Sequence, residues 1–207
     1  KLMAPSLSGF DLQGGRQTLD GTTLTVRTEE APAFVADYVL PPAPAHRQRF
    51  RAELAGDPLL QVGALPIIRQ AVAIAGDSRD PREIAERVNR WVHENVEKVP
   101  TFSIPNALSV LTDRRGDCNE HAQLFVALTR ALGIPSRVAS GVAYLNGKFY
   151  FHAWAEVYLG SWVAVDPTWG QFPADAAHLR VVTGGLGRQA ELIRLIGTLR
   201  IEVEDVQ

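Results

Sequence analysis

One predicted helix constrains the fold of this chain more than any other feature. Asp117 and Glu120 have the spacing of a capping box, in which each side chain accepts a hydrogen bond from the other residue's backbone amide. From Ala122 to Leu132 nearly every residue is apolar, and Gly133 and Pro135 follow in the order that ends helices. A helix that is apolar on all sides must be surrounded by other elements. The sequence therefore predicts a central, buried helix.

The first turn of this predicted helix contains Cys118, the single cysteine of the chain. A thiol attacks carbonyl carbons as a thiolate, and because a free thiol has a pKa of about 8.5, a nucleophilic cysteine needs surroundings that favour the anion. The positive end of a helix dipole provides such surroundings. A cysteine with only a packing role remains the alternative, although the apolar middle of the helix would suit it better. A single cysteine excludes an intramolecular disulfide and a zinc site with several cysteines.

Three strands are predicted after this helix. Residues 136–145 and 148–159 flank Asn146-Gly147, the strongest short signal for a β-hairpin. Residues 162–166 follow Gly160-Ser161 and would add a third strand. The sequence therefore predicts an antiparallel meander directly after the buried helix.

Side chains of the middle strand divide into two faces, because successive residues of a strand point in opposite directions. The apolar residues from Phe151 to Val157 form the face expected to pack on the core. His152 lies on the other face with aromatic and polar neighbours such as Trp154, as the wall of a cleft would. Glu156 shares that face and is expected to point into the cleft or into solvent. A strand histidine is more often structural than catalytic, so its partners must decide its role.

A register argument places a carboxylate beside this histidine. We predict that Tyr158 pairs with Trp162 across a three-residue loop. In that register Asp166 lies opposite Trp154 and diagonal to His152, within reach of a carboxylate–imidazole hydrogen bond. A two-residue turn would place the carboxylate on the wrong face.

The hairpin at Asn146-Gly147 gives a second register prediction. Pairing of Leu145 with Lys148 places Gly141 opposite His152. We expect the missing side chain to leave room for the imidazole ring.

Residues 1–62 are predicted to be an N-terminal extension, and residues 63–207 the main domain. The extension has strand-like residues at 22–28 and 34–40, followed by prolines typical of a linker. In the main domain, Asp80 and the proline after it predict the start of an amphipathic helix.

Charge and hydropathy exclude some classes of function. The formal net charge of −2 gives no basic field for a phosphate backbone, which argues against nucleic acid as a partner. No apolar run reaches the roughly 20 residues that a transmembrane helix needs. Because the first residue is Lys1, we expect a fragment or processed form from which any targeting segment has been lost. The oligomeric state is left open.

Four segments resemble the transglutaminase-like superfamily. Residues 116–122 and 132–137 (Gly-Asp-Cys-Asn-Glu-His-Ala and Leu-Gly-Ile-Pro-Ser-Arg) resemble its cysteine block. Residues 152–158 (His-Ala-Trp-Ala-Glu-Val-Tyr) resemble its histidine block, and residues 162–168 (Trp-Val-Ala-Val-Asp-Pro-Thr) its aspartate block. The resemblance spans about residues 80–182. It implies an α+β, papain-like core in which the cysteine-bearing helix packs on an antiparallel sheet.

The same resemblance implies a chemistry. Cys118 would attack an amide or ester carbonyl of a protein or peptide substrate and form a thioester. His152 would remove the thiol proton and later protonate the leaving group, and Asp166 would fix its tautomer. An amine as acceptor would give transamidation, whereas water would give hydrolysis, as in protease-like and amidase-like relatives. No cofactor and no metal ion is expected, and the sequence has no acidic cluster suited to calcium.

Other residues are expected near the site as oxyanion or supporting groups: Asn119, His121, Trp154 and Trp91. Cross-linking members of the superfamily use an indole from upstream of the cysteine, where Trp91 is the sole tryptophan. The helical spacing of Trp91 favours a core position instead. The backbone amide of Cys118 is therefore the preferred oxyanion donor.

Other interpretations stay open. The main alternative is a catalytically silent binding or scaffolding module with the same fold. A metal site formed by Cys118, His121, His152 and Asp166 is another, because the first two have i, i+3 spacing on a helix. A thiol redox role would lack a resolving cysteine. By analogy with the superfamily, we expect a bacterial protein that is extracytoplasmic or membrane-associated.

Overall fold

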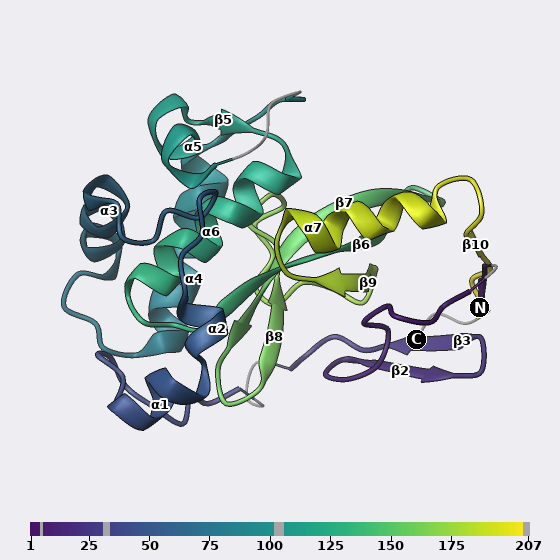
Figure 1. Ribbon diagram of the computed structural model, residues 1–207, viewed down its shortest axis with the longest axis horizontal. Coiled ribbons are helices and arrows are strands. Elements are labelled where there is room, and N and C mark those ends of the chain that lie inside the picture. The colour runs from purple at the N-terminus through teal and green to yellow at the C-terminus, as the bar shows by residue number, and fades with distance from the viewer. Residues whose placement is uncertain (5, 31–33, 102–105, 205–207) are drawn as a thin grey trace.

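A four-stranded antiparallel sheet with the strand order β8–β7–β6–β9 lies against a group of helices (Figure 1). The computed structural model describes residues 1–4, 6–30, 34–101 and 106–204. The helices are α1 (Pro44–Arg49), α2 (Arg51–Leu54), α3 (Leu65–Ala75), α4 (Pro81–Asn95), α5 (Ala107–Asp113), α6 (Cys118–Ala131), α7 (Leu186–Gln189) and the 3-10 helix η2 (Ala190–Leu195). The strands are β1 (Leu2–Met3), β2 (Gln17–Asp20), β3 (Thr23–Val26), β4 (Glu97–Lys98), β5 (Arg115–Gly116), β6 (Ser136–Leu145), β7 (Lys148–Tyr158), β8 (Trp162–Val165), β9 (His178–Thr183) and β10 (Arg200–Ile201).

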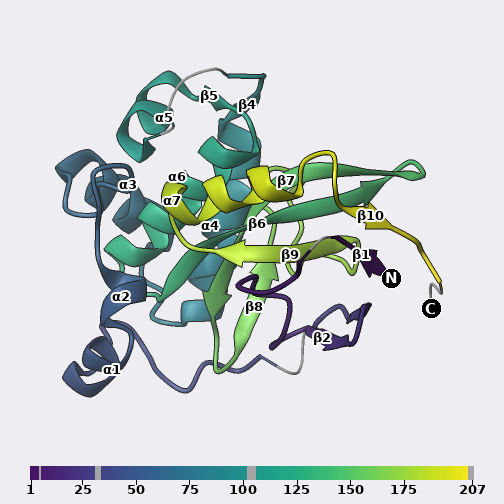
Figure 2. The ribbon, with the colours of Figure 1, turned by 45° about the vertical axis from the view of Figure 1, so that its right-hand side comes forward.

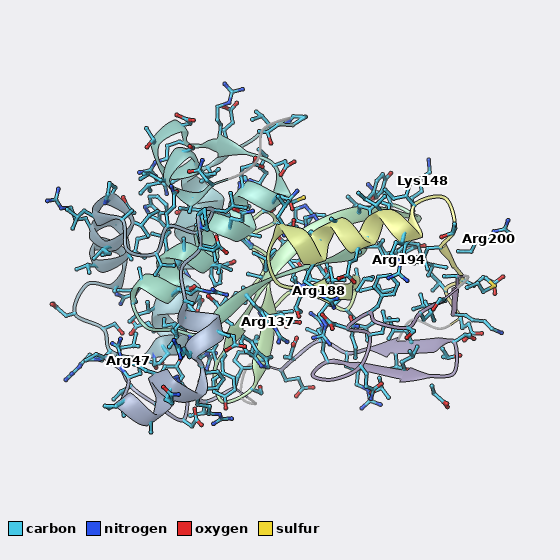
Figure 3. All side chains as sticks on the ribbon, viewed as in Figure 1. Arg47, Arg137, Lys148, Arg188, Arg194 and Arg200 are labelled. Atoms are coloured by element: carbon cyan, nitrogen blue, oxygen red, sulfur yellow. The ribbon has the colours of Figure 1, made fainter. Side chains whose placement is uncertain are left out.

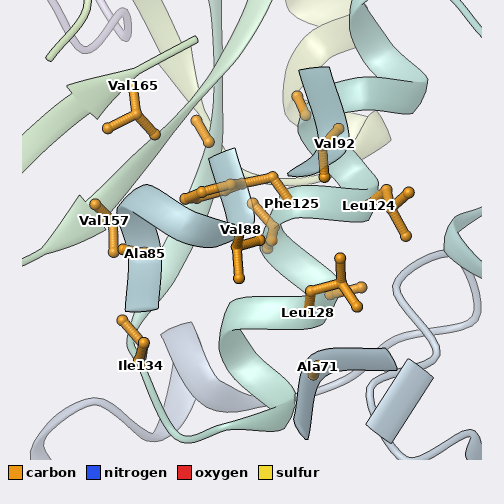
Figure 4. Packing of buried hydrophobic residues seen from close by; sticks show 14 of the residues in the cluster. Ala71, Ala85, Val88, Val92, Leu124, Phe125, Leu128, Ile134, Val157 and Val165 are labelled. Atoms are coloured by element: carbon orange, nitrogen blue, oxygen red, sulfur yellow. The ribbon is translucent and has the colours of Figure 1, made fainter. Parts of the chain in front are cut away.

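Helix α6 is buried at the centre of the domain, as predicted. Ala122 and residues 124–128 have no exposed surface, and the helix packs against α3, α4, α5 and β7 (Figure 4). The predicted capping box forms, with the Asp117 amide donating to Glu120 Oε2 at 2.9 Å. Burial of each large apolar side chain contributes roughly 1.5–3 kcal/mol. The first turn of α6, which carries Cys118, is therefore held by both its cap and the core.

Helix α4 also begins where the sequence predicts. The Asp80 side chain accepts a hydrogen bond from the Arg82 amide at 2.9 Å, and Pro81 occupies the first helical turn. Ile84 and Val88 lie on the face that packs against α6 in the main core. Among the residues that the structure describes, no helix has the length and apolarity needed to cross a membrane.

The register of the meander is confirmed in both hairpins. Tyr158 pairs with Trp162 across the β7–β8 turn. Gly160 in that turn has a φ of +79°, a conformation that glycine adopts without strain. In the β6–β7 hairpin, Gly141 pairs with His152, as predicted.

Strand β9 adds a fourth strand that the sequence pattern did not predict. It pairs with β6, and a bulge interrupts the ladder between Ser140 and Gly141. A Cβ atom on Gly141 would overlap the carbonyl oxygen of Leu179. The predicted reason for this glycine is therefore wrong, because the missing side chain makes room for the backbone of β9 and not for the imidazole of His152.

The N-terminal residues contact the main domain. Strand β1 pairs with β10, so the first strand of the chain lies beside the last described one (Figures 1 and 2). The Asp11 amide donates to the Val181 carbonyl of β9 at 2.7 Å. Within the predicted extension, β3 confirms a strand at 22–28, and β2 pairs with it. The domain boundary after residue 62 stays a prediction.

The second strand predicted in the extension is absent. Residues 34–40 form no strand, and Phe34 and Leu40 are instead buried in the main core. Tyr38 points the same way, because its hydroxyl donates to the Tyr158 carbonyl at 2.9 Å. This segment therefore joins the core mainly through its side chains and not as a strand of a sheet.

Candidate active site

Cys118 is the first residue of α6 and is partly exposed. Three local features hold it there. The Asp117 side chain accepts from the Asn119 amide at 2.8 Å, which caps the helix. Strand β5, just before the cap, pairs with β4. A Cβ atom on Gly116 would overlap the Glu120 side chain, so the glycine allows the chain to turn directly into the helix.

His152 and Asp166 form the hydrogen bond that the register predicted. The distance from His152 Nε2 to Asp166 Oδ2 is 2.7 Å, and the Asp166 side chain has no exposed surface. The turn after β8 orients the carboxylate, because Asp166 Oδ1 accepts from the backbone amides of Thr168 at 2.7 Å and Trp169 at 3.1 Å. The carboxylate is therefore fixed through both oxygens.

The His152 imidazole lies between this carboxylate and the Cys118 thiol. Burial opposes protonation of His152, but hydrogen bonds and charge interactions with Asp166 and Cys118 outweigh burial and raise the pKa of His152 to about 9. Because Nε2 is bonded to Asp166, Nδ1 is the nitrogen left for the thiol. The three side chains thus follow one another in the order Cys118, His152, Asp166, with a hydrogen bond of 2.7 Å between the last two.

Two tryptophans enclose the imidazole. The Trp169 ring stacks on His152 with ring centroids 4.4 Å apart and an angle of 13° between the planes. Trp154 lies at 6.0 Å and is almost fully buried. An aromatic face attracts a cation, so this stacking favours the protonated ring. It also keeps water from the hydrogen bond between His152 and Asp166.

A second histidine, not predicted from the sequence, reaches the same carboxylate. His178 on β9 has no exposed surface, and its Nε2 lies 3.0 Å from Asp166 Oδ2. Its Nδ1 lies 2.9 Å from Asp175 Oδ1. Burial would raise the pKa of Asp166, but its hydrogen bonds and charge interactions with His152 and His178 outweigh burial and hold that pKa well below its usual range. The alternation of polar and apolar residues in 178–183 could have indicated this strand.

The part of the chain that holds this site is similar to known proteins. Residues 69–167 match the family model of the transglutaminase-like superfamily. Residues 69–167 are transglutaminase-like. The match includes the segments that hold Cys118, His152 and Asp166, and the cysteine-bearing helix packs on an antiparallel sheet as the sequence predicted.

Individual relatives of the transglutaminase-like domain are distant. An uncharacterized protein of Mycobacterium leprae is 29% identical over 126 residues, which cover 54% of this chain and 45% of that protein. The structure of a proposed cysteine protease from Cytophaga hutchinsonii is similar with a TM-score of 0.61 and 24% identity, over 76% of this chain and 53% of that one. The periplasmic domain of TgpA from Pseudomonas aeruginosa is similar with a TM-score of 0.49 and 21% identity, over 83% of this chain and 72% of that one. The chain therefore spans about half the length of the first two relatives.

Two other residues predicted near the site, His121 and Trp91, lie on helices α6 and α4. His121 is buried, and its ring nitrogens face the backbone carbonyls of Asp117 at 2.7 Å and Val96 at 3.2 Å. Burial lowers the pKa of His121, although these two contacts oppose the effect. His121 therefore connects the end of α4 to the start of α6. Trp91 lies on α4, partly buried, with the Arg114 guanidinium 4.3 Å from its ring centroid.

The backbone amides at the start of α6 differ in their availability. The Asn119 amide is taken by the Asp117 side chain. The Cys118 amide has no acceptor among the residues that the structure describes. Of these two amides, the one on Cys118 is thus open to a developing oxyanion.

Three side chains that could together bind a metal ion are instead hydrogen-bonded to one another. In the described part of the chain, His152, Asp166 and His178 offer ligand atoms within 4.8 Å of one another. Both histidines, however, point Nε2 at the same carboxylate oxygen. His121 points at backbone carbonyls, so the predicted metal alternative that includes it does not fit this geometry.

Glu156 is neither in a cleft nor in solvent, contrary to prediction. Only 2% of its side chain is exposed, and it accepts from Arg180 Nη1 at 2.7 Å and Arg137 Nε at 2.8 Å (Arg137 is labelled in Figure 3). Arg180 also donates to the carbonyls of Gln13 and Gly14. The buried pair thus connects the face of the sheet that carries His152 to the N-terminal residues.

Proposed function

We propose that this domain is a cysteine-dependent acyl-transfer enzyme that acts on amide groups of proteins or peptides through a thioester. One observation supports this proposal above all: the Cys118 thiol interacts with the imidazole of His152, whose Nε2 is bonded to a buried carboxylate. The raised pKa of His152 favours an imidazolium at neutral pH, which stabilises a neighbouring thiolate.

The first step forms the acyl-enzyme. The thiolate of Cys118 attacks the carbonyl carbon, and the electron pair of the carbonyl moves to oxygen, where the Cys118 amide can donate a hydrogen bond. When the intermediate collapses, the carbon–nitrogen bond breaks and the leaving nitrogen takes the proton from His152 Nδ1. The products of this step are a thioester on Cys118, a free amine or ammonia, and a neutral His152.

The second step releases the acyl group. A water molecule or a primary amine transfers a proton to His152 Nδ1 as it attacks the thioester carbon. Collapse breaks the carbon–sulfur bond and restores the thiolate–imidazolium pair. Water gives a carboxylic acid, so the domain acts as a protease or amidase, and an amine gives a new amide, so it acts as a transglutaminase.

Alkylation of Cys118 by iodoacetamide, followed by mass spectrometry, tests this proposal. We expect rapid alkylation that persists well below pH 8 in the wild type and is lost in His152→Ala. Incubation with glutamine-containing peptides, with and without a fluorescent primary amine, then identifies the acceptor. Ordinary thiol behaviour in both proteins would contradict the proposal and would favour a catalytically silent binding module.

A further inference from the structure

We infer that His178 is a positioning residue of the proposed active site, which holds Asp166 against His152 and, as a buried cation, limits how strongly Asp166 retains the proton of His152. The inference rests on the proposed function, in which His152 must hold a proton and also release it. His178 bonds to Asp166, and its ring centroid lies 5.6 Å from that of His152, so its charge acts on His152 both through Asp166 and directly, in the same direction.

The contacts of His178 join two carboxylates. Nε2 lies 3.0 Å from Asp166 Oδ2, and Nδ1 lies 2.9 Å from Asp175 Oδ1. The ring has no exposed surface and meets the rings of Trp154 and Trp169 edge-on, with centroids 5.2 Å and 5.0 Å apart. The imidazole therefore cannot turn away from either carboxylate without breaking this packing.

The carboxylates on the two sides of His178 suit a ring that donates from both nitrogens. An ionised carboxylate only accepts hydrogen bonds, and a neutral imidazole has one donor and one acceptor nitrogen. Contacts with His152 and His178 keep the pKa of Asp166 low, and hydrogen bonds from Gln171 and His178 do the same for Asp175, in each case against the effect of burial. Both nitrogens of His178 face such a carboxylate, and the imidazolium is the form of the ring that can donate to both.

Other charged groups also surround this network. Arg16 donates to the backbone carbonyls of Ala174 and Asp175 and so adds positive charge at the outer end. His121 on α6 interacts electrostatically with Asp166. The Asp175 side chain is half exposed, at 51%. The network therefore runs from the thiol at Cys118 to the surface at Asp175.

Two imidazoles bond to one oxygen of Asp166, so a charge on one ring changes the pKa of the other. A positive charge on His178 offsets part of the negative charge that Asp166 presents to His152. Without that cation the full carboxylate charge would act on His152 and raise its pKa further. A general acid that holds its proton too strongly transfers it slowly, so a moderating cation suits the acid step.

Histidine NMR titration of the full chain tests the inference. A ¹⁵N-histidine spectrum is assigned by comparison with His152→Ala, and the titration midpoint of His152 is then measured in the wild type and in His178→Gln. The glutamine amide can still donate to Asp166 but carries no charge. We expect the midpoint to rise by at least half a pH unit. No change, or a fall, would overturn the inference.

His93→Gln is the matched control. His93 contacts the same turn, with Nδ1 3.0 Å from the Thr168 carbonyl, but it makes no contact with Asp166. We expect the titration midpoint of His152 in His93→Gln to match that in the wild type. An equal rise in this control would overturn the inference, because the rise would then come from disturbance of the turn.

A second variant tests positioning. His178→Phe keeps a ring but donates to neither carboxylate, and we expect the rate of iodoacetamide alkylation at pH 7 to fall at least tenfold. His178→Gln should retain a rate within threefold of the wild type. Equal rates in all three proteins would contradict a positioning role. Circular dichroism checks folding, and if His178→Phe does not fold, the titration of His178→Gln decides. The NMR titration needs no catalytic turnover. If the protein shows no acyl-transfer activity but His178→Gln still raises the titration midpoint of His152, the result would refute the proposed function and not this inference.

Discussion

His152 and Asp166 meet across neighbouring strands, 2.7 Å apart from Nε2 to Oδ2, at the point where β8 ends. Their contact depends on the three-residue loop around Gly160, because a loop shorter by one residue would turn the carboxylate to the opposite face of the sheet. The same turn that ends β8 provides the two backbone amides that bind Asp166 Oδ1. Backbone geometry therefore determines the pairing before any side chain adjusts.

Removal of the thiol should make His152 less basic. In the wild type, interactions with Asp166 and Cys118 raise the pKa of His152 to about 9 against the effect of burial. Cys118→Ala removes the thiolate, an anion that stabilises the imidazolium, so the pKa of His152 must move downward. Histidine NMR titration of both proteins measures this change. An unchanged or higher midpoint would show that Cys118 and His152 do not interact.

The charge on Asp166 should matter more than its shape. Asp166→Asn removes the anion and can leave His152 in the wrong tautomer, a change that lowers turnover on the order of 10⁴-fold in serine proteases. We expect the alkylation rate of Cys118 at pH 7 to fall more than tenfold. Asp77→Asn, at an exposed position, is the control and should leave the rate unchanged. A fall of less than tenfold in Asp166→Asn would argue against its orienting role.

The buried pair formed by Glu156 and Arg180 should be sensitive to loss of one partner. Glu156→Gln leaves Arg180, which is 4% exposed, without its counter-charge, and we expect a loss of roughly 3–5 kcal/mol in the free energy of unfolding. Glu86→Gln breaks an exposed pair with Arg90 and should cost less than about 1 kcal/mol. Urea unfolding followed by circular dichroism measures both. Similar losses in the two variants would mean that water screens the inner pair.

Gly141 should tolerate no side chain. Its Cβ would overlap the Leu179 carbonyl oxygen, and because backbone cannot move aside cheaply, Gly141→Ala should separate β9 from β6 and destabilise the domain by about 3 kcal/mol or more. Gly63→Ala is the control, since nothing lies near its added methyl group. Thermal unfolding compares the two. Since β9 carries His178, the histidine signals of Gly141→Ala should also shift if the protein still folds.

Sequence alone was sufficient for features that depend on neighbouring residues. The cap at Asp117, the apolar run of α6 and the turn at Asn146-Gly147 each involve a few consecutive residues, and each formed as predicted. The placement of Asp166 needed one further step, the loop length at Gly160. Strand pairing has a period of two residues, so one correct loop determines the face of every later side chain.

Only the tertiary structure decided which distant residues meet. His178 reaches Asp166 because the chain passes from β8 at one edge of the sheet to β9 at the other edge, where β9 pairs with β6 and a bulge lies beside Gly141. Gln17 binds the Arg180 carbonyl from 163 residues away in the chain. Such contacts depend on how whole elements pack, and a local pattern carries no information about a partner so far along the chain. The sequence therefore determined the central helix, the meander and the spacing of Cys118, His152 and Asp166, whereas packing determined the added strand β9 and the buried charges that surround the site.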